Sequence, residues 1–206
     1  MSIEIKISKK PVEYRKAITF LEKRLIKLKN NKAAELVWIL EHPKIYTGGI
    51  SYKNYEVLDK NIKIINTNRG GKITWHGPGQ TICYFVIDLS KRNKDIRKFV
   101  LNLEKIIIKT LKEYKIKSFP DRKNIGIWVN HKNKIKKVSA IGIKVKKWIA
   151  YHGFSINIKN DLKYYEKIVP CGIINREVIN LTNIKNQKYN FIHKKIIKNF
   201  IKYLKV

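Results

Sequence analysis

The sequence predicts an α+β fold, a mixed β-sheet with helices packed on it. Segments with apolar residues at helical spacing interrupt groups of short strand-like segments, without the regular strand–helix–strand order of a parallel α/β protein. The chain of 206 residues is long enough for one hydrophobic core. It contains no internal repeat, low-complexity linker or shift in composition that would mark a boundary. We therefore expect residues 1–206 to form a single domain.

The first half of the chain predicts one helix and several strands. A short alternating strand opens the sequence. Roughly residues 12–29, after Pro11, carry apolar side chains every three or four positions, which indicates an amphipathic helix. Further strands are predicted over residues 36–40, 62–66 and 81–89.

The second half predicts two helices around a run of short strands. Apolar residues keep helical spacing between Ile96 and Tyr114, and again between Asn190 and Leu204. Between these helices, strands separated by Asn, Lys and Gly turns are predicted over residues 125–129, 137–145, 148–152 and 154–158.

The segment from Arg69 to Gln80, RGGKITWHGPGQ, is the most informative part of the chain. Five of its twelve residues are Gly or Pro, and Arg, Thr, His and Gln stand between them. Glycine suits positions where the backbone comes close to another group, and proline stiffens a turn. We expect a rigid loop that lets a ligand approach backbone amides, although composition alone also fits an ordinary turn between strands.

Three later segments join this one in a recognisable order: Lys137–Gly142 (KVSAIG), His152–Asn157 (HGFSIN) and Pro170–Ile173 (PCGI). With RGG-x-x-T-x-HGPGQ, they resemble the octanoyltransferases of lipoate biosynthesis, also called lipoyl(octanoyl) transferases. Leu40–Pro43 with Tyr46-Thr47, and Gly126–Val129, extend the resemblance to about residues 13–180. It implies a single catalytic domain with the fold of the biotin and lipoate protein ligases.

Of the two cysteines, Cys171 is the candidate nucleophile. Pro170 restricts the backbone before it and Gly172 permits an unusual turn after it, which suits a thiol presented at a loop tip. Cys83 lies inside an apolar strand, where a cysteine behaves as a small hydrophobe. The two are far apart and show no metal-ligand spacing, so neither a disulfide framework nor a zinc site is expected.

A thiol with an ordinary pKa of about 8.5 needs a neighbour that favours the thiolate. Residue types alone do not choose among the many lysines, and a lysine at a strand end is ordinarily solvated. The resemblance implies that Lys137 is the catalytic lysine, which lowers the pKa of Cys171 and acts as general acid and base. Lys136 should point to the opposite face of a regular strand.

The resemblance implies a reaction through an octanoyl thioester on Cys171. The donor would be octanoyl-acyl carrier protein, and the acceptors would be lipoyl domains of 2-oxoacid dehydrogenase E2 subunits and the glycine cleavage H protein. No cofactor, metal or ATP is expected, because the acyl group arrives activated. No phosphate-binding loop is expected either, since Ile73 and not Ser or Thr follows Gly71-Lys72.

Other motif residues are expected to bind the acyl chain. These are Arg69, Gly70, Gly71, Lys72, Ile73, Thr74, Trp75, His76, Ala140, Ile141, Gly142, Gly153, Phe154 and Ser155. Trp75 stands where the family pattern usually has Tyr. For His76, a hydrogen bond that holds the loop is as good a hypothesis as a contact to substrate, and neither His76 nor His152 is predicted to be a third catalytic base.

The net charge of +31, from 46 Lys+Arg against 15 Asp+Glu, has two interpretations. Lysine is spread along the chain with many Ile and Asn, as an AT-rich coding sequence would produce. A basic surface would also steer acidic partners such as acyl carrier proteins and lipoyl domains. Nucleic-acid binding is less well supported, because no nucleic-acid motif is present.

A cytoplasmic protein without membrane association is expected, because the sequence has no signal-peptide pattern and no apolar run of about 20 residues. Three alternative functions stay open. One is an ATP-dependent lipoate or biotin protein ligase of the same fold, and another an amidotransferase that moves octanoyl groups between lipoyl proteins. The third, from a different class, is a basic nucleic-acid-binding module.

Overall fold

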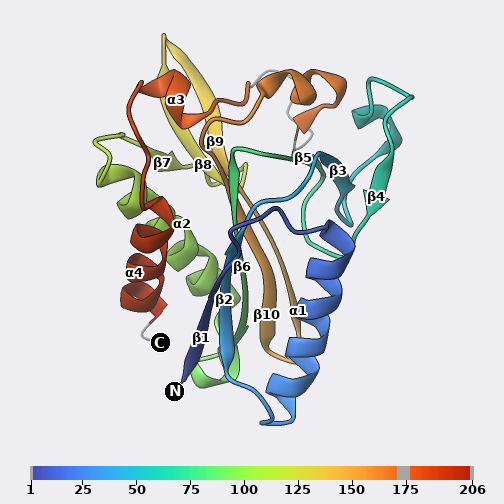
Figure 1. Ribbon diagram of the computed structural model, residues 1–206, viewed down its shortest axis with the longest axis vertical. Helices are drawn as coiled ribbons and strands as arrows, with labels where there is room; N and C mark the ends of the chain where they lie inside the picture. Colours follow the sequence, from blue (N-terminus) through green and yellow to red (C-terminus); the bar gives the residue numbers. More distant parts are fainter. Residues whose placement is uncertain (1, 171–176, 205–206) are drawn as a thin grey trace.

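A computed structural model describes residues 2–170 and 177–204 and shows one large sheet covered by helices on both faces (Figure 1). The sheet order is β1-β2-β6-β10-β9-β8-β7. The strands are β1 (Ile3–Ile7), β2 (Glu35–Leu40), β6 (Gln80–Asp88), β10 (Ile149–Asn157), β9 (Lys134–Lys146), β8 (Ile127–His131) and β7 (Phe119–Pro120). β1 and β2 run parallel and the other neighbours antiparallel, which confirms the predicted mixed sheet.

A second, three-stranded sheet holds the glycine-rich segment. Its order is β4 (Ile64–Asn66), β3 (Ile45–Gly48) and β5 (Ile73–His76). The predicted strand at 62–66 is therefore shorter and belongs to this small sheet. The expectation of a loop throughout residues 69–80 was wrong, because Ile73–His76 pair with β3 as a fully buried strand and Gln80 begins β6.

Helices cover both faces of the large sheet. α1 (Tyr14–Lys29) packs on one face, and α2 (Ile96–Lys112) and α4 (Ile192–Leu204) pack on the other (Figure 1). The short helices are η1 (Asn54–Glu56), η2 (Leu89–Lys91), η3 (Leu162–Lys167) and α3 (Leu181–Ile184). All three long helices were predicted, with ends within two residues of those observed.

Local chemistry explains where α1 and α2 begin. The Glu13 carboxylate accepts hydrogen bonds from the backbone amides of Arg15 and Lys16, and the Asp95 carboxylate accepts one from Lys98. Such caps satisfy amides that have no partner within the first turn of a helix. α1 then buries Ala17, Leu21 and Leu25 against the sheet, as the spacing predicts.

Two tight hairpins connect the strands that form the site. Lys132-Asn133 join β8 to β9, and Lys147-Trp148 join β9 to β10, all with positive φ between 50° and 63°. Two-residue turns of this kind match the twist of antiparallel strands. The strands predicted at 148–152 and 154–158 form the single strand β10, in which His152 also has a positive φ of 70°.

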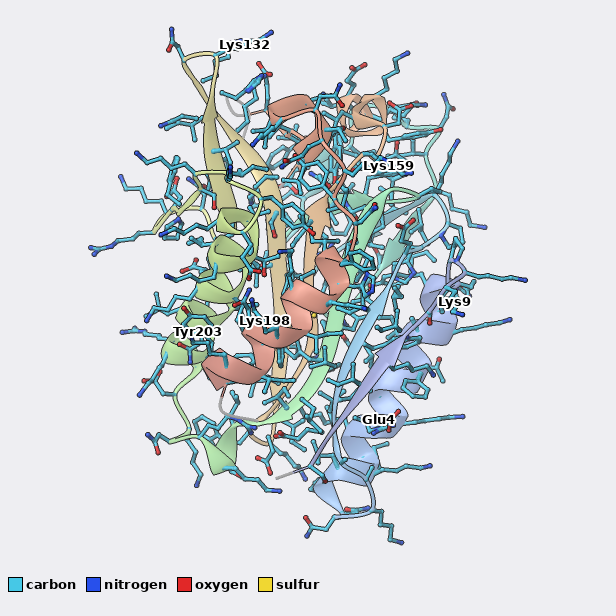
Figure 2. All side chains as sticks on the ribbon, turned by 60° about the vertical axis from the view of Figure 1, so that its left-hand side comes forward. Glu4, Lys9, Lys132, Lys159, Lys198 and Tyr203 are labelled. Atoms are coloured by element: carbon cyan, nitrogen blue, oxygen red, sulfur yellow. The ribbon has the colours of Figure 1, made fainter. Side chains whose placement is uncertain are left out.

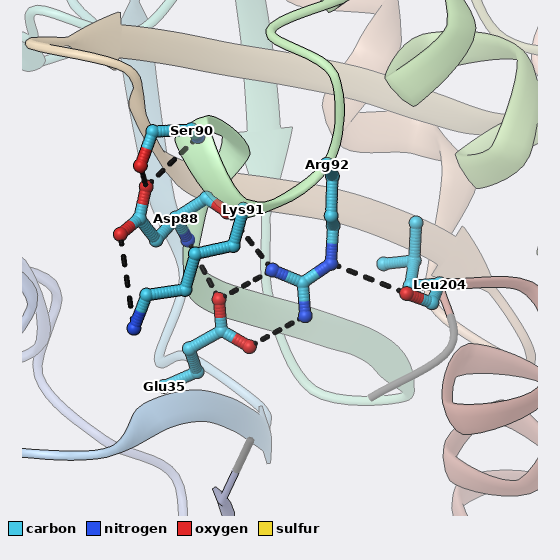
Figure 3. Close-up of polar contacts among 6 residues, drawn as sticks. All are labelled: Glu35, Asp88, Ser90, Lys91, Arg92 and Leu204. Atoms are coloured by element: carbon cyan, nitrogen blue, oxygen red, sulfur yellow. Dashed lines mark hydrogen bonds and ion pairs between the residues drawn. The ribbon is translucent and has the colours of Figure 1, made fainter.

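A buried ion pair connects β2 to Arg92, which follows η2, and through Arg92 to the C-terminal end of α4 (Figure 3). The guanidinium of Arg92 contacts both carboxylate oxygens of Glu35 at 2.6 and 2.7 Å, and its Nε donates to the carbonyl of Leu204. The Glu35 carboxylate also accepts the backbone amide of Asp88. This contact, the Glu35–Arg92 brace, joins β2, the end of β6 and the end of α4.

Lysine side chains cover much of the surface. Lys9, Lys132 and Lys198 extend from three different parts of the molecule (Figure 2). The excess of positive charge is therefore spread over the fold and not confined to one element. Within residues 2–170 and 177–204, no helix is long and apolar enough to cross a membrane.

Candidate functional site

A cavity of about 460 Å³ lies between the glycine-rich segment and strands β9 and β10. Its size is in the usual range of small-molecule sites, about 300–1,000 Å³. Apolar surface from Ile141, Ile143 and Phe154 faces it together with the polar groups of Arg69 and Lys137. Its lining residues are Ser51, Arg69–Thr74, His76, Ile82, Tyr84, Val100, Lys123–Ile125, Lys137, Ala140–Ile143 and His152–Ser155.

Backbone contacts hold the glycine-rich segment against β9. The amide of Gly70 donates to the carbonyl of Ile143 at 3.0 Å. A Cβ at Gly142 would lie only 3.1 Å from the carbonyl oxygen of Gly70, so the absence of a side chain permits this close approach. On the other side, the amides of Ile50 and Ser51 donate to the carbonyls of Arg69 and Gly71. These glycines thus permit close packing between backbones, and the approach of a ligand to the backbone amides stays a prediction.

Arg69 places a buried positive charge at the cavity wall. Its guanidinium donates to the carbonyl and hydroxyl of Thr47, at 2.8 and 2.9 Å, and to the carbonyl of Gly70. These bonds fix the guanidinium between β3 and the glycine-rich segment. Its charge also helps to lower the pKa of His76 and of His152.

His76 belongs to a buried hydrogen-bond network centred on Gln80. Its Nδ1 contacts Gln80 Oε1 at 2.7 Å. The Gln80 amide nitrogen in turn contacts Asn157 Oδ1, the Tyr165 hydroxyl and the Trp75 carbonyl. The structure thus supports the hypothesis that His76 holds the segment by a hydrogen bond. Burial lowers the pKa of His76 to about 3, so its imidazole is neutral near pH 7.

His42 and Tyr84 form a second polar pair, and Tyr84 lines the cavity. His42 Nδ1 donates to the carbonyl of Val12 at 2.6 Å, so the Tyr84 hydroxyl donates to its unprotonated Nε2 at 2.9 Å. Burial lowers the pKa of His42 to about 4 and raises the pKa of Tyr84. Both groups are therefore neutral near pH 7.

His152 is the third buried histidine at the site. Its Nε2 contacts Asn68 Oδ1 at 2.7 Å, and within the described part of the chain its Nδ1 has no hydrogen-bond partner. Burial, with Arg69 and Lys144 nearby, lowers its pKa to about 3. His152 is therefore a neutral imidazole hydrogen bonded to an amide, and the expectation that it is not a catalytic base stays a prediction.

Lys137 is buried, with 6% of its surface exposed. Its ammonium lies over the ring of Trp128, 4.9 Å from the centroid, and the residue lines the cavity. A solvated strand-end lysine, the ordinary expectation for this residue type, is therefore excluded. Lys136, its neighbour, forms an ion pair with Glu177 outside the cavity, as expected for the opposite face of the strand.

The chain on both sides of the segment 171–176 lies next to Lys137. Pro170 and Val178 line a space of about 10 Å³ together with Lys137, Ser139 and Asn157. The Lys137 amide donates to the carbonyl of Glu177, and the amide of Ile179 donates to the carbonyl of Lys137, both at 2.9 Å. The predicted nucleophile Cys171 itself lies outside the described residues. Cys83 is fully buried and its thiol pKa is raised by that burial, as expected for a structural cysteine.

Most of the predicted binding residues come together at this cavity. Arg69, Gly70, Gly71, Lys72, Ile73, Thr74, His76, Ala140, Ile141, Gly142, Gly153, Phe154 and Ser155 all line it. Trp75 does not, and its assignment to the cavity wall was wrong. Its ring stacks on Tyr164 with centroids 4.8 Å apart and packs against Tyr165 in a separate apolar cluster.

Sequence reasoning missed several lining residues: Ser51, Ile82, Tyr84, Val100, Lys123, Asn124, Ile125 and Ile143. Tyr84 lies in the segment predicted as a strand, but alternation along that strand could not show that one residue would face a cavity. No group of three His, Cys, Asp or Glu residues suited to a metal ion occurs within residues 2–170 and 177–204.

The two-sheet architecture is that of the lipoate and biotin protein ligases. A lipoate-protein ligase A crystallised with ATP superposes with a TM-score of 0.77 at 16% identity, covering all of this chain and 86% of that one. The apo biotin protein ligase of Aquifex aeolicus gives a TM-score of 0.53 at 15% identity, covering 99% of this chain and 69% of that one. At such low identities these likenesses bear on the fold.

The chain belongs to the lipoyl protein ligase A/B catalytic domain family, which it matches over residues 13–205. It is 43% identical to a protein named octanoyltransferase from Ehrlichia ruminantium (strain Gardel), over 93% of this chain and 91% of that one. It is 44% identical to an octanoyltransferase of Wolbachia pipientis wMel, over 81% and 82% of the two chains. These relatives confirm the resemblance predicted from the motifs and the class of enzyme, an acyltransferase.

Proposed function

We propose that this enzyme transfers an octanoyl group from octanoyl-acyl carrier protein to the target lysine of lipoyl domains, in the cytoplasm. The acceptors would be the lipoyl domains of 2-oxoacid dehydrogenase E2 subunits and the glycine cleavage H protein. Relatives at 41–44% identity named octanoyltransferase support the acyl group. A related fold has been solved as an archaeal lipoate protein ligase system with its E2 lipoyl domain, which supports the kind of acceptor.

One observation carries the proposal: the buried Lys137 lies where the acyl-sized cavity meets the residues on both sides of the segment 171–176, which contains Cys171. Lys137 lines the cavity, and it also lines the small space beside Pro170 and Val178. An ammonium near a thiol favours the thiolate, which is the nucleophilic form. We therefore assign Cys171 as the nucleophile and Lys137 as the general acid and base.

The proposed steps return the enzyme to its starting protonation state, with one proton passed from the acceptor amine to the carrier thiol. The Cys171 thiolate attacks the thioester carbonyl, the bond to the carrier sulfur breaks, and the ammonium of Lys137 protonates the departing thiolate. The neutral amine of the acceptor lysine then attacks the octanoyl-enzyme. Lys137 takes a proton from that nitrogen, and Cys171 leaves as the thiolate. The products are an amide and the enzyme in its starting state.

The other cavity residues would bind the acyl chain. Ile141, Ile143 and Phe154 offer apolar surface, and the backbone at Gly70, Gly142 and Gly153 also lines the cavity. The spread of lysines over the surface would raise the encounter rate with acidic donor and acceptor domains more than the final affinity.

The test is the intact mass of the protein after incubation with octanoyl-acyl carrier protein in the absence of ATP. We expect an octanoyl adduct on the wild type and on Cys83→Ala, the matched control at the buried cysteine, but none on Cys171→Ser. Acyl transfer that requires ATP and free octanoate would instead assign an ATP-dependent ligase, the activity suggested by the ATP-bound structural neighbour.

A further inference from the structure

Gly126 leaves the space through which the Lys137 side chain reaches the cavity. It precedes β8, the strand that pairs with β9, and has a positive φ of 137°. A Cβ at this position would lie 2.7 Å from Lys137 Cε, 3.3 Å from its Nζ and 2.7 Å from the carbonyl oxygen of Ser139. Since non-bonded carbon atoms approach to about 3.5–4.0 Å, any side chain at residue 126 would displace Lys137.

Trp128 supplies the surface on which the ammonium lies. Its indole is 1% exposed, and Lys137 Nζ is 4.9 Å from the ring centroid, inside the roughly 6 Å limit for cation–π attraction. The indole Nε1 donates to the carbonyl of Asn124 at 3.0 Å, which fixes the plane of the ring. The attraction is strong for a pair removed from water, and Trp is the best aromatic partner for a cation.

The backbone of Lys137 is fixed independently of its side chain. The amide and carbonyl of Lys137 bond to Glu177 and Ile179, and Asn157 Nδ2 donates to the carbonyl of Ile179 at 3.2 Å. The remaining freedom therefore lies in the long lysine side chain. Gly126 leaves room for the aliphatic stem of that side chain, and the Trp128 ring attracts its charged ammonium.

Resting on the proposed function, we infer that Trp128 and Gly126 are positioning residues that hold the ammonium of Lys137 at the reacting atoms. A position needing only apolar volume is served by Leu. The indole adds a fixed π-face and a hydrogen bond that locks it. Without the ring, the lysine side chain gains rotamers that turn the ammonium away, and misplacement by about 1 Å can cost two orders of magnitude in rate.

The experiment measures the single-turnover rate of octanoyl-enzyme formation from octanoyl-acyl carrier protein between pH 6 and 9. For Trp128→Leu we expect a rate roughly tenfold lower than that of the wild type. We also expect the rising limb of the pH profile at higher pH, because the thiolate loses its neighbouring charge. Trp128→Phe keeps a ring and should recover most of the rate.

Tyr114→Leu is the matched control. Tyr114 is also a buried aromatic residue with a lysine over its ring, Lys195 Nζ at 5.0 Å, and it does not line the cavity. This variant should lose thermal stability yet keep the wild-type pH profile. A shifted profile in Tyr114→Leu would attribute the effect to general loosening of the core and overturn the inference.

Wild-type rate and pH profile in Trp128→Leu would also overturn it. If Trp128→Leu does not fold, Gly126→Ala decides, with Trp128→Phe as the variant that keeps a ring. Circular dichroism first establishes that each is folded. A folded Gly126→Ala with the wild-type profile then contradicts the inference, whereas a profile moved to higher pH supports it. Failure of the wild type to form the adduct would contradict the proposed function itself, which separates the two outcomes.

Discussion

Gln80 accepts a hydrogen bond from His76 at 2.7 Å, and this contact determines the tautomer of a histidine in the cavity wall. The Gln80 amide nitrogen faces three acceptors, Asn157 Oδ1, the Tyr165 hydroxyl oxygen and the Trp75 carbonyl, so its oxygen must face His76. His76 Nδ1 therefore carries the proton and Nε2 is an acceptor. The cavity wall thus presents a neutral imidazole.

The three buried histidines predict a loss of stability in mild acid. Burial lowers the pKa of His42 to about 4 and the pKa values of His76 and His152 to about 3. Below the ordinary pKa of 6.5, the unfolded chain binds protons that the folded chain does not. The free energy of unfolding should therefore fall between pH 7 and 5, by up to about 1.4 kcal/mol per pH unit for each histidine. Urea denaturation at the two pH values measures it.

The carboxylates have little effect on the change in unfolding free energy between pH 7 and 5. Hydrogen bonds to Asn199 and two lysines lower the pKa of Glu113 to about 2 against the opposing effect of burial, so its contribution is lost only below about pH 4.5. Burial raises the pKa of Glu104, which acts in the opposite direction, and Glu104→Gln removes that contribution. An unfolding free energy of the wild type that does not change between pH 7 and 5 would contradict the burial of the three imidazoles.

Asn157→Ala should slow octanoyl-enzyme formation as well as destabilise the fold. The substitution removes one of the acceptors of the Gln80 amide and the Asn157 Nδ2 donor to the carbonyl of Ile179, at a cost of about 1–3 kcal/mol in unfolding free energy. Because Ile179 pairs with the backbone of Lys137, the rate should fall as well. Asn180→Ala, which removes a buried bond to the carbonyl of Asn160, should lose stability but keep the rate. Equal rates in both variants would show that the Asn157 network has no effect on Lys137.

The Glu35–Arg92 brace predicts a large effect on stability and none on chemistry. Arg92→Met leaves the 2%-exposed carboxylate of Glu35 without its cation, and breaking a buried pair costs about 3–5 kcal/mol. Lys91→Ala removes only a 4.0 Å contact to Asp88 at the surface, which should change the unfolding free energy by less than about 1 kcal/mol (Figure 3). Similar unfolding free energies for the two variants, measured by urea denaturation, would contradict the prediction.

The length of acyl chain accepted should follow the volume of the cavity. Ala140→Leu adds side-chain atoms at its wall, whereas Ile141→Ala removes them. The first variant should prefer thioesters shorter than octanoyl and the second should accept longer ones. The two preferences are read from intact masses after competition among C6, C8 and C10 donors. The same preference in both variants would place the acyl chain elsewhere.

Sequence patterns predicted the long helices and the strands of the large sheet except β7, because each follows from local periodicity. They failed where contacts between residues far apart in the sequence determine the structure. Gly153 suggested a break between two strands, yet β10 continues through it. A Cβ there would overlap the carbonyl oxygen of Cys83 on β6, so this glycine serves close packing between strands. β3 was missed because its four residues are too short for a clear pattern.

In the candidate site, too, local motifs predict some features, and contacts with distant residues determine the others. The motif residues of the glycine-rich segment, β9 and β10 could be predicted as a group, although Trp75 faces another cluster because side chains alternate along β5. The burial of Lys137 depends on Gly126 and on Ile179, which lies 42 positions further along the chain. No local pattern around Lys137 contains that information.

The residues that line the cavity come from positions as far apart as Ser51 and Ser155, and from both sheets as well as α2. The cavity needs strands of both sheets in place, so partial unfolding of either sheet removes it. A ligand held there binds only the complete fold, and its binding free energy adds to that of global unfolding. Heat resistance of the whole domain would then serve as a measure of acyl occupancy, without any assay of catalysis.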